Sequence, residues 1–264
     1  MKSLQIFALK SSKIVDWGDS VFDIFLESIK NENFEIEDDD VITITSKIYS
    51  MEQKAAVILK DVIPSEEAIK LAEKSTLNPS LAQLVLNESK GEVYGAVYKA
   101  ILAKTDYGLS ANAGIDQSNC PEGYALLLPR NPDNAALEFK NRIKDALGKE
   151  VAVIITDSRT IPLKKGTSAV AIGVAGIDPI IDEKGKRDLY GYKMMITTRA
   201  LADNLSTATN LLMGETDEKM PYGIIRGLEY ARAHNVSVKS TLMPENYCLY
   251  FAPLLELINK TNET

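Results

Sequence analysis

The sequence predicts a mixed α+β (mixed α/β) fold built as one domain over residues 1–264. Apolar runs of strand length alternate irregularly with stretches of helical spacing, without the strict β–α repetition of a doubly wound sheet. A chain of 264 residues can bury a full core, and neither a repeat nor a low-complexity linker divides it. We therefore expect strands and helices to share a single domain.

The first half of the chain begins with a strand and a capped helix. Trp17–Ser20 provides a turn and a cap ahead of the helical spacing that begins at Val21. Three acids, Asp38–Asp40, precede a buried strand; because consecutive side chains do not converge, a solvated turn is favoured over a metal site. The expected strands cover 4–9, 41–45, 93–97 and 98–102. Helices are expected to begin at residues 21 and 64 and to cover 79–87.

The second half contains the most strongly apolar strand, Val151–Ile155, which is apolar on both faces and therefore belongs inside a sheet. We expect it to end at Thr156–Ser158, where a carboxylate is as typical of a turn as of an active site. Residues 182–191 form a polar excursion with glycine hinges. The remaining expectations are strands over 124–129 and 169–175, helices over 132–147, 197–213 and from residue 229, and an apolar segment over 247–258 that packs on the domain.

Composition excludes several classes of function. A net charge of −7 argues against wholesale binding to nucleic acid or to an anionic membrane, because both attract basic surfaces. No apolar run approaches the roughly 18 residues of a membrane span, and the N-terminus lacks the apolar centre of a signal peptide. Cys120 and Cys248 form neither a disulfide framework nor a zinc cluster. Cytoplasm is the expected compartment.

The single histidine limits the chemistry further. His234 lies in a polar stretch that we expect to be exposed, which argues against Ser–His–Asp and Cys–His nucleophiles. No phosphate-binding GxxxxGK[ST] motif is present, and Gly173–Gly176 does not have the GxGxxG spacing. Catalysis must therefore rest on carboxylates, lysines, hydroxyls and a hard metal ion bound through oxygen.

Two polar segments could carry such chemistry. Ser110–Asn119 fits neither helix nor strand: Gly114 tolerates a positive φ, and Asp116 lies among Asn and Ser groups. A surface loop with a helix N-cap at Asp116 or Ser118 explains the segment equally well. Ser46 and Lys47 follow a buried strand, a position that suits a phosphate, although an ordinary polar strand exit is favoured from the residues alone.

These segments resemble, in the same order, the motifs of the coenzyme F420:L-glutamate ligase family (F420-0 γ-glutamyl ligases). Ala111–Asn119 resembles the family's ANAGVDxSN signature. The resemblance covers about residues 15–228 and leaves 229–264 unexplained. The other matching elements are Thr45–Ile48 (TSKIVSK), Thr156–Ser158 (TDT), Ala171–Gly176 (VAIGVAG), the spaced Asp182, Gly185, Asp188 and Gly191, Met213–Glu215 (MGE) and Arg226–Leu228 (RGL).

The resemblance implies a GTP-dependent ligase that adds L-glutamate to a carboxyl-bearing acceptor such as F420-0 through an acyl phosphate. It implies divalent Mn²⁺ or Mg²⁺, admits K⁺ as a further cofactor, and suggests a family-specific two-subdomain fold in an intertwined homodimer. Carried over to this chain, Asp116 and Asp157 hold one metal, and Ser158 and Glu215 hold the other. The nucleotide-binding residues would be Ser46, Lys47, Asn119, Met213, Gly214, Glu215 and Thr216, and the catalytic ones Asp116, Asp157 and Lys47.

Several departures from the family pattern surround these positions. In the run that follows Asp157, Thr160 replaces a glycine, Ile161 and Lys164 replace arginines, and Thr167 replaces a glutamine, while Met51 replaces a lysine. Lysine does not reproduce the bidentate anion contact of arginine. We interpret the chain as a divergent ligase. The alternatives are a folate or pterin γ-glutamyl ligase with the same chemistry, and a non-catalytic nucleotide- or metal-binding homologue.

Overall fold

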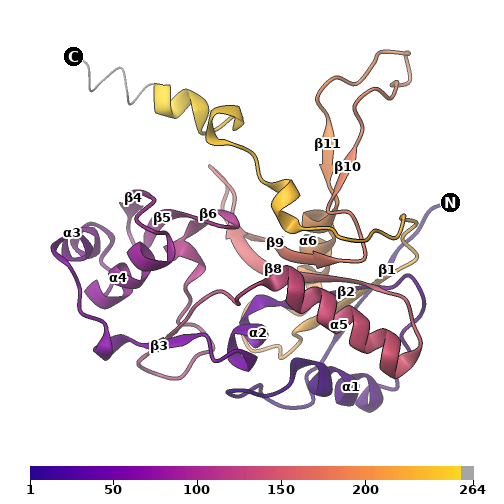
Figure 1. Ribbon diagram of the computed structural model, residues 1–264, viewed down its shortest axis with the longest axis horizontal. Helices are drawn as coiled ribbons and strands as arrows, with labels where there is room; N and C mark the ends of the chain where they lie inside the picture. Colours follow the sequence, from indigo (N-terminus) through magenta and orange to yellow (C-terminus); the bar gives the residue numbers. More distant parts are fainter. Residues whose placement is uncertain (257–264) are drawn as a thin grey trace.

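The computed structural model describes residues 1–256 and is centred on a five-stranded sheet (Figure 1). Only β2 and β8 run parallel; the other neighbours are antiparallel. As predicted, the most apolar strand is an inner one, with β8 paired to β2 on one side and β9 on the other. The strand order is β1 (Gln5–Leu9), β12 (Tyr222–Arg226), β2 (Val41–Thr45), β8 (Ala152–Thr160) and β9 (Thr167–Ala175).

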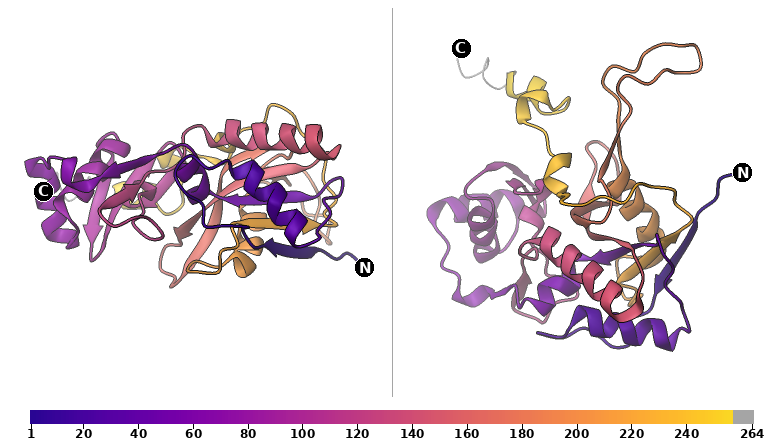
Figure 2. Two further views of the ribbon diagram at one scale, coloured as in Figure 1. Left: turned by 90° about the horizontal axis from the view of Figure 1, so that it is seen from below. Right: turned by 45° about the vertical axis from the view of Figure 1, so that its right-hand side comes forward.

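Alternation along the strands gives the sheet two buried faces. Ile42 and Ile44 share a core with α1 (Val21–Asn31) and α5 (Pro132–Leu147). Val41, one residue away, belongs to the opposite core, which is formed with α6 (Leu201–Met213). Successive strand side chains point to opposite faces, so helices cover both sides of the sheet (Figure 2).

A second hydrophobic core lies beside this sheet (Figure 1). Leu81, Val85 and Ile101 are buried in it, between two helices and a three-stranded sheet. The elements around it are α3 (Glu66–Ser75), α4 (Pro79–Glu88), β4 (Val93–Val97), β5 (Ala100–Thr105) and β6 (Gly108–Ala111). Between the two cores lie α2 (Ser46–Glu52) and the paired strands β3 (Ala56–Ile58) and β7 (Tyr124–Leu126). The strand expected over 124–129 is thus only three residues long.

A two-stranded arm projects from the body (Figures 1 and 2). It consists of β10 (Ile180–Asp182) and β11 (Thr198–Ala200) and includes the polar excursion that was expected over 182–191. Asp188 accepts hydrogen bonds from the backbone N–H groups of Tyr190 and Tyr192 at 2.9 and 2.8 Å, which shapes the tip of the arm. None of the helices in residues 1–256 is long and apolar enough to cross a membrane.

The last third of the chain differs from the sequence analysis in three places. The helix expected over 197–213 begins only at Leu201, because the preceding three residues pair with β10. Strand β12 was not predicted at all. Instead of the helix expected from residue 229, the structure has 3₁₀ turns at η3 (Val238–Thr241) and η4 (Glu245–Tyr247) before a helical turn over 252–256.

The apolar segment expected over 247–258 packs less closely than predicted. The side chain of Phe251 meets the ring of Tyr94 edge to face at 4.6 Å, which ties the segment to β4. Tyr247, Leu249 and Leu254 are nevertheless exposed. Residues 257 and 258 of this prediction lie outside the described residues.

Two residues of the acidic triplet, Asp38 and Asp39, form the solvated turn that was expected, but Asp40 is fully buried. Its two carboxylate oxygens accept hydrogen bonds from Nε and Nη2 of Arg226 at 2.8 and 2.7 Å. Arg226 comes from β12 and therefore fixes the turn before β2 to a strand that is distant in sequence. Two parallel N–H···O bonds make this a geometrically specific pair.

We expect Asp40→Asn to lower the free energy of unfolding by about 3 kcal/mol, because it leaves the Arg226 guanidinium without its buried counter-charge. Asp39→Asn is the matched control. Asp39 pairs with Arg232 at 2.6 Å, but both side chains are about half exposed, so this loss costs little. Urea denaturation of both variants measures the difference. Equal stability of the two variants would contradict the structural role of the Asp40–Arg226 pair.

Candidate active site

One cavity of about 620 Å³ lies where the ends of β2 and β8 face β6 and the segment that follows it. All the site residues predicted from the sequence line it, although they come from four separate parts of the chain. These residues are Ser46, Lys47, Asp116, Asn119, Asp157, Ser158, Met213, Gly214, Glu215 and Thr216.

Lys47 and Asp116 form an ion pair in this cavity. Lys47 Nζ lies 2.7 Å from Asp116 Oδ2 and donates a hydrogen bond to Ser118 Oγ at 2.8 Å. Ser118 donates its backbone N–H to Asp116 Oδ1 at 2.7 Å. Burial acts to raise the pKa of Asp116, but the hydrogen bonds from Lys47 and from the Ser118 N–H outweigh it, so the net pKa is lowered. Asp116 therefore remains a carboxylate at neutral pH.

The backbone before Asp116 is a tight turn, as the small residues indicated. Asn112, Ala113 and Gly114 have φ values of 52°, 53° and 75° in the 3₁₀ turn η2 (Asn112–Gly114). A Cβ on Gly114 would approach Leu128 Cδ1 to 2.7 Å. No helix begins at Asp116 or Ser118, so the N-cap alternative is wrong: Asp116 instead exchanges two backbone hydrogen bonds with Leu126.

We expected Asp157 to lie at the end of its strand. In the structure it lies inside the strand. After an irregularity at Ile155/Thr156, β8 continues to Thr160, paired with β9. Asp157 Oδ1 accepts a hydrogen bond from Ser46 Oγ at 2.9 Å, and Oδ2 accepts one from Arg159 Nε at 3.3 Å. Burial dominates the electrostatics and raises the pKa of Asp157, although Arg159 and Ser46 act against it.

Glu215 is the third carboxylate of the cavity and follows the C-terminus of α6. Its Oε1 accepts hydrogen bonds from Ser158 Oγ at 2.7 Å, Asn210 Nδ2 at 3.0 Å and Thr167 Oγ1 at 3.2 Å. Ser158 thus presents its hydroxyl to Glu215 from β8, next to Asp157. Ser158 and Glu215, which the resemblance assigns to one metal, thus lie in direct contact.

Asn119 joins the two loops that were expected to contact the nucleotide. Its side-chain Nδ2 donates to the carbonyl oxygen of Thr216 at 2.9 Å. The backbone N–H of Thr216 in turn donates to Glu218 Oε2 at 2.8 Å, which closes the loop after Gly214. Segments nearly a hundred residues apart therefore line the same side of the cavity.

Sequence reasoning missed two charged residues of the cavity lining, the exposed Lys13 and the buried Arg159. Asp157 and Arg159 are two positions apart on a strand and so share a face, a signal that was hidden because the strand was expected to end before them. The residues that depart from the family pattern lie in two different places. Thr160, Thr167 and Met51 line the cavity, whereas Ile161 and Lys164 are absent from its lining and exposed in the β8–β9 hairpin.

The donor atoms of the site suit a hard cation, because they are carboxylate and hydroxyl oxygens. Within residues 1–256, no three acidic, histidine or cysteine side chains converge as a metal-binding group. Lys47 and Arg159 engage Asp116 and Asp157. A carboxylate has about four lone-pair sites on its two oxygens, so the donor chemistry fits a divalent metal beside these ion pairs. His234 is exposed, as predicted.

Comparison with known proteins identifies the family. The family model of the F420-0:Gamma-glutamyl ligase matches residues 10–227. The Coenzyme F420:L-glutamate ligase of Methanothermobacter thermautotrophicus is 36% identical over 243 residues, 91% of this chain and 96% of the relative.

Two further proteins with the same name show similar identity. The protein of Methanosarcina mazei is 35% identical over 242 residues, 92% of this chain and 93% of its own length. That of Methanocaldococcus jannaschii is 40% identical over 195 residues, 74% of this chain and 78% of its own length. The chain belongs to the F420-0:γ-glutamyl ligase family.

Proposed function

We propose that this chain is a GTP-dependent γ-glutamyl ligase that joins L-glutamate to coenzyme F420-0 through an amide bond. Family membership supports the ligase chemistry, and the names of the relatives support the acceptor and the amino acid. The observation that carries the proposal is that Lys47, Asp116, Asp157 and Glu215 line the same cavity. Its volume of about 620 Å³ is within the range of small-molecule sites.

The proposed reaction proceeds in two steps. A carboxylate oxygen of the acceptor attacks the γ-phosphorus of GTP, which forms an acyl phosphate and releases GDP. The amine of glutamate then attacks the acyl carbon, phosphate leaves with the bridging oxygen, and the amine loses a proton as the amide forms. Activation is needed because a free carboxylate does not react with an amine.

The residues of the cavity have distinct roles in this proposal. Lys47 supplies a fixed positive charge to the phosphates, held in place by Asp116 and Ser118. Asp116 and Asp157 would hold one divalent metal, and Ser158 and Glu215 the other; when bound, Mn²⁺ or Mg²⁺ neutralises phosphate charge. Ser46, Asn119 and the loop from Met213 to Thr216 would contact the nucleotide.

A second acceptor class has a specific observation in its favour. Met51, Thr160 and Thr167 line the cavity at positions where the sequence departs from the family motifs. Changes in the lining of a cavity alter which acceptor fits it, and the carboxylates Asp116, Asp157 and Glu215 are all retained. A folate or pterin γ-glutamyl ligase is therefore the second candidate.

Incubating the purified chain with GTP, Mn²⁺ and [¹⁴C]glutamate tests the proposal, with F420-0 and a dihydropteroate-type acceptor supplied in parallel. Label in F420-0 supports the first candidate, and label only in the pterin supports the second. GTP binding without incorporation into either acceptor would favour a non-catalytic nucleotide-binding homologue. Replacing GTP by ATP in the same assay gives the nucleotide preference.

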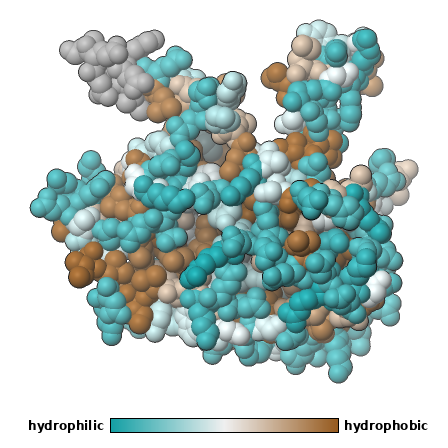
Figure 3. Space-filling model, viewed as in Figure 1, coloured by the Kyte–Doolittle hydropathy of each residue, from teal (hydrophilic) through white to brown (hydrophobic). Residues whose placement is uncertain are grey.

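We also propose that the chain forms a homodimer through its projecting arm. Between β10 and β11 the arm exposes large apolar side chains, which a second copy could cover (Figure 3). The exposed residues are Leu189, Tyr190, Tyr192, Met195 and Ile196.

We expect the chain to elute as a dimer in size-exclusion chromatography with light scattering, and Leu189→Asp/Ile196→Asp to shift it to a monomer. A buried charge at such an interface is unfavourable without a partner. Leu163→Asp is the matched control, because Leu163 is equally exposed but lies in the β8–β9 hairpin. A dimer that persists in the double variant, or a monomeric wild type, would contradict the role of the arm.

A further inference from the structure

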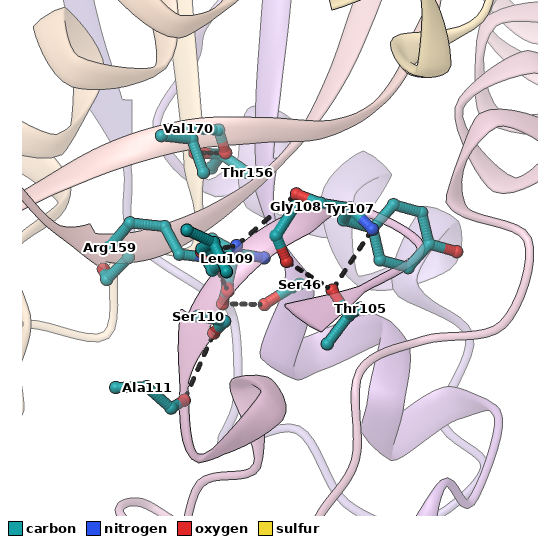
Figure 4. Close-up of polar contacts among 12 residues, drawn as sticks. Ser46, Thr105, Tyr107, Gly108, Leu109, Ser110, Ala111, Thr156, Arg159 and Val170 are labelled. Carbon is teal, nitrogen blue, oxygen red and sulfur yellow. Dashed lines mark hydrogen bonds and ion pairs between the residues drawn. The ribbon is translucent and has the colours of Figure 1, made fainter. Parts of the chain in front are cut away.

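Arg159 is a buried charged residue of the cavity that the proposed reaction does not use. Among the described residues it is the only arginine that lines the cavity, and its side chain is 8% exposed. It extends from β8 toward β6, a strand of the three-stranded sheet (Figure 4). A buried guanidinium in this position requires an explanation, because an ionised group is costly to bury unless it is paired.

The guanidinium links two parts of the site that are about fifty residues apart. Its Nε donates to Asp157 Oδ2 at 3.3 Å, and its Nη1 donates to the carbonyl oxygen of Leu109 at 2.9 Å. Leu109 belongs to β6, which leads directly into the turn before Asp116. Arg159 therefore connects the strand of one site carboxylate to the strand that precedes the other.

A second route between the two carboxylates closes a ring. Ser46 holds the other oxygen of Asp157, and the next residue, Lys47, holds Asp116. Asp157 is thus fixed from both sides, by α2 through Ser46 and by β6 through Arg159. Without Arg159, only the Ser46 hydroxyl orients this carboxylate.

The third nitrogen of the guanidinium, Nη2, argues against a purely stabilising role for Arg159. Arg159 Nη2 is buried and has no hydrogen-bond partner among the described residues. A buried donor that lacks an acceptor weakens a fold, so stability alone does not explain an arginine at this position. The fork of the guanidinium, in contrast, reaches a carboxylate and a carbonyl at once, which a lysine does not reproduce.

We propose that Arg159 is a positioning residue that sets the orientation of Asp157 and its distance from Asp116 by tying β8 to β6. Its effect on catalysis rests on the proposed ligase function. The link between β8 and β6 does not depend on that function.

Hydrogen exchange measured by mass spectrometry on the full chain tests the link directly. In Arg159→Met we expect the amides of β6 and of the turn up to Asp116 to exchange about tenfold faster than in the wild type, because the anchor of this segment is lost. Lys165→Met is the matched control; it removes an exposed charge from the adjoining β8–β9 hairpin and should leave exchange unchanged. Unchanged exchange in a folded Arg159→Met protein would overturn the proposal. If that variant does not fold, Arg159→Lys replaces it in the same comparison.

Steady-state kinetics then distinguish positioning from general stabilisation. We expect kcat of Arg159→Met to fall about a hundredfold, as misplaced catalytic groups cause, while KM for GTP changes less than about threefold. Arg159→Lys should recover little of kcat, since it keeps the charge but not the fork. Full recovery by lysine would overturn the positioning role. If the wild type has no ligase activity, the proposed function is refuted but the link made by Arg159 is not. Hydrogen exchange would still decide whether Arg159 connects β8 to β6.

Discussion

Replacing Asp157 by asparagine should abolish turnover while leaving the fold intact. The change keeps the shape of the side chain and its hydrogen bond to Ser46 but removes the negative charge that the proposed metal site needs. Burial already raises the pKa of Asp157, which favours a neutral side chain there. The change also removes the charged partner of the buried Arg159, so we expect the protein to remain folded with a free energy of unfolding lowered by about 3 kcal/mol. We expect kcat to fall by at least about a hundredfold, measured as GTP-dependent glutamate incorporation.

Asp203→Asn is the matched control for this prediction. Asp203 is another partly buried carboxylate whose pKa is raised by burial, and it holds the backbone N–H of Ala171 at 2.9 Å. It does not line the cavity. Circular dichroism should show both variants folded, with activity lost only in Asp157→Asn. A folded Asp157→Asn protein that retains turnover would refute the assignment of Asp157 to the reaction.

Replacing Lys47 by methionine should have the next largest effect. Lys47 Nζ is the cation nearest to Asp116, and its side chain is about three-quarters buried. Because the variant lacks one preorganised charge at a phosphate, we expect its kcat to fall by about a hundredfold. Lys47→Arg should not restore kcat, because Asp116 and Ser118 hold a compact ammonium group.

Lys60→Met provides the comparison for Lys47→Met. Lys60 is exposed and does not line the cavity. Kinetics with varied GTP should show a reduced kcat only in Lys47→Met and Lys47→Arg. Wild-type kcat in Lys47→Met would show that the charge at this position does not act in the rate-limiting step.

The parts of the fold that could be predicted depend on local signals. The apolar run Val151–Ile155 identified an inner strand, and Ser20 marked the start of α1, where its side chain caps the Asp23 N–H. The composition of Ser110–Asn119 indicated an irregular turn, which the positive φ values of Asn112 and Gly114 confirm, whereas Ser110 and Ala111 belong to β6. These features require only neighbouring residues.

The features that were missed depend on contacts between distant residues. Strand β12 is short, and it is a strand because β1 and β2 lie on either side of it. Asp40 is buried because Arg226 pairs with it from β12. The polar residues of β8 beyond Ile155 remain extended because β9 pairs with them as far as Thr160. Pairing with remote strands decided each case, and tertiary contacts commonly override local preference in this way.

The residues of the candidate site were selected on a different basis. Its residues came from a resemblance that names individual positions, and the structure brings all of those positions into one cavity. Arg159 lies between the motif positions and was therefore not selected. Its role becomes visible only when the direction of β8 and the proximity of Leu109 are known.

The central claim is that this cavity transfers the γ-phosphate of GTP to a carboxylate before the amide bond forms. The most direct test supplies F420-0 labelled with ¹⁸O in its reacting carboxyl group, together with GTP, Mn²⁺ and L-glutamate, and analyses both products by mass spectrometry. The account predicts one ¹⁸O atom in the released phosphate and one retained in the amide. Unlabelled phosphate would contradict it, because it would mean that GTP is hydrolysed by water and not used to activate the acceptor.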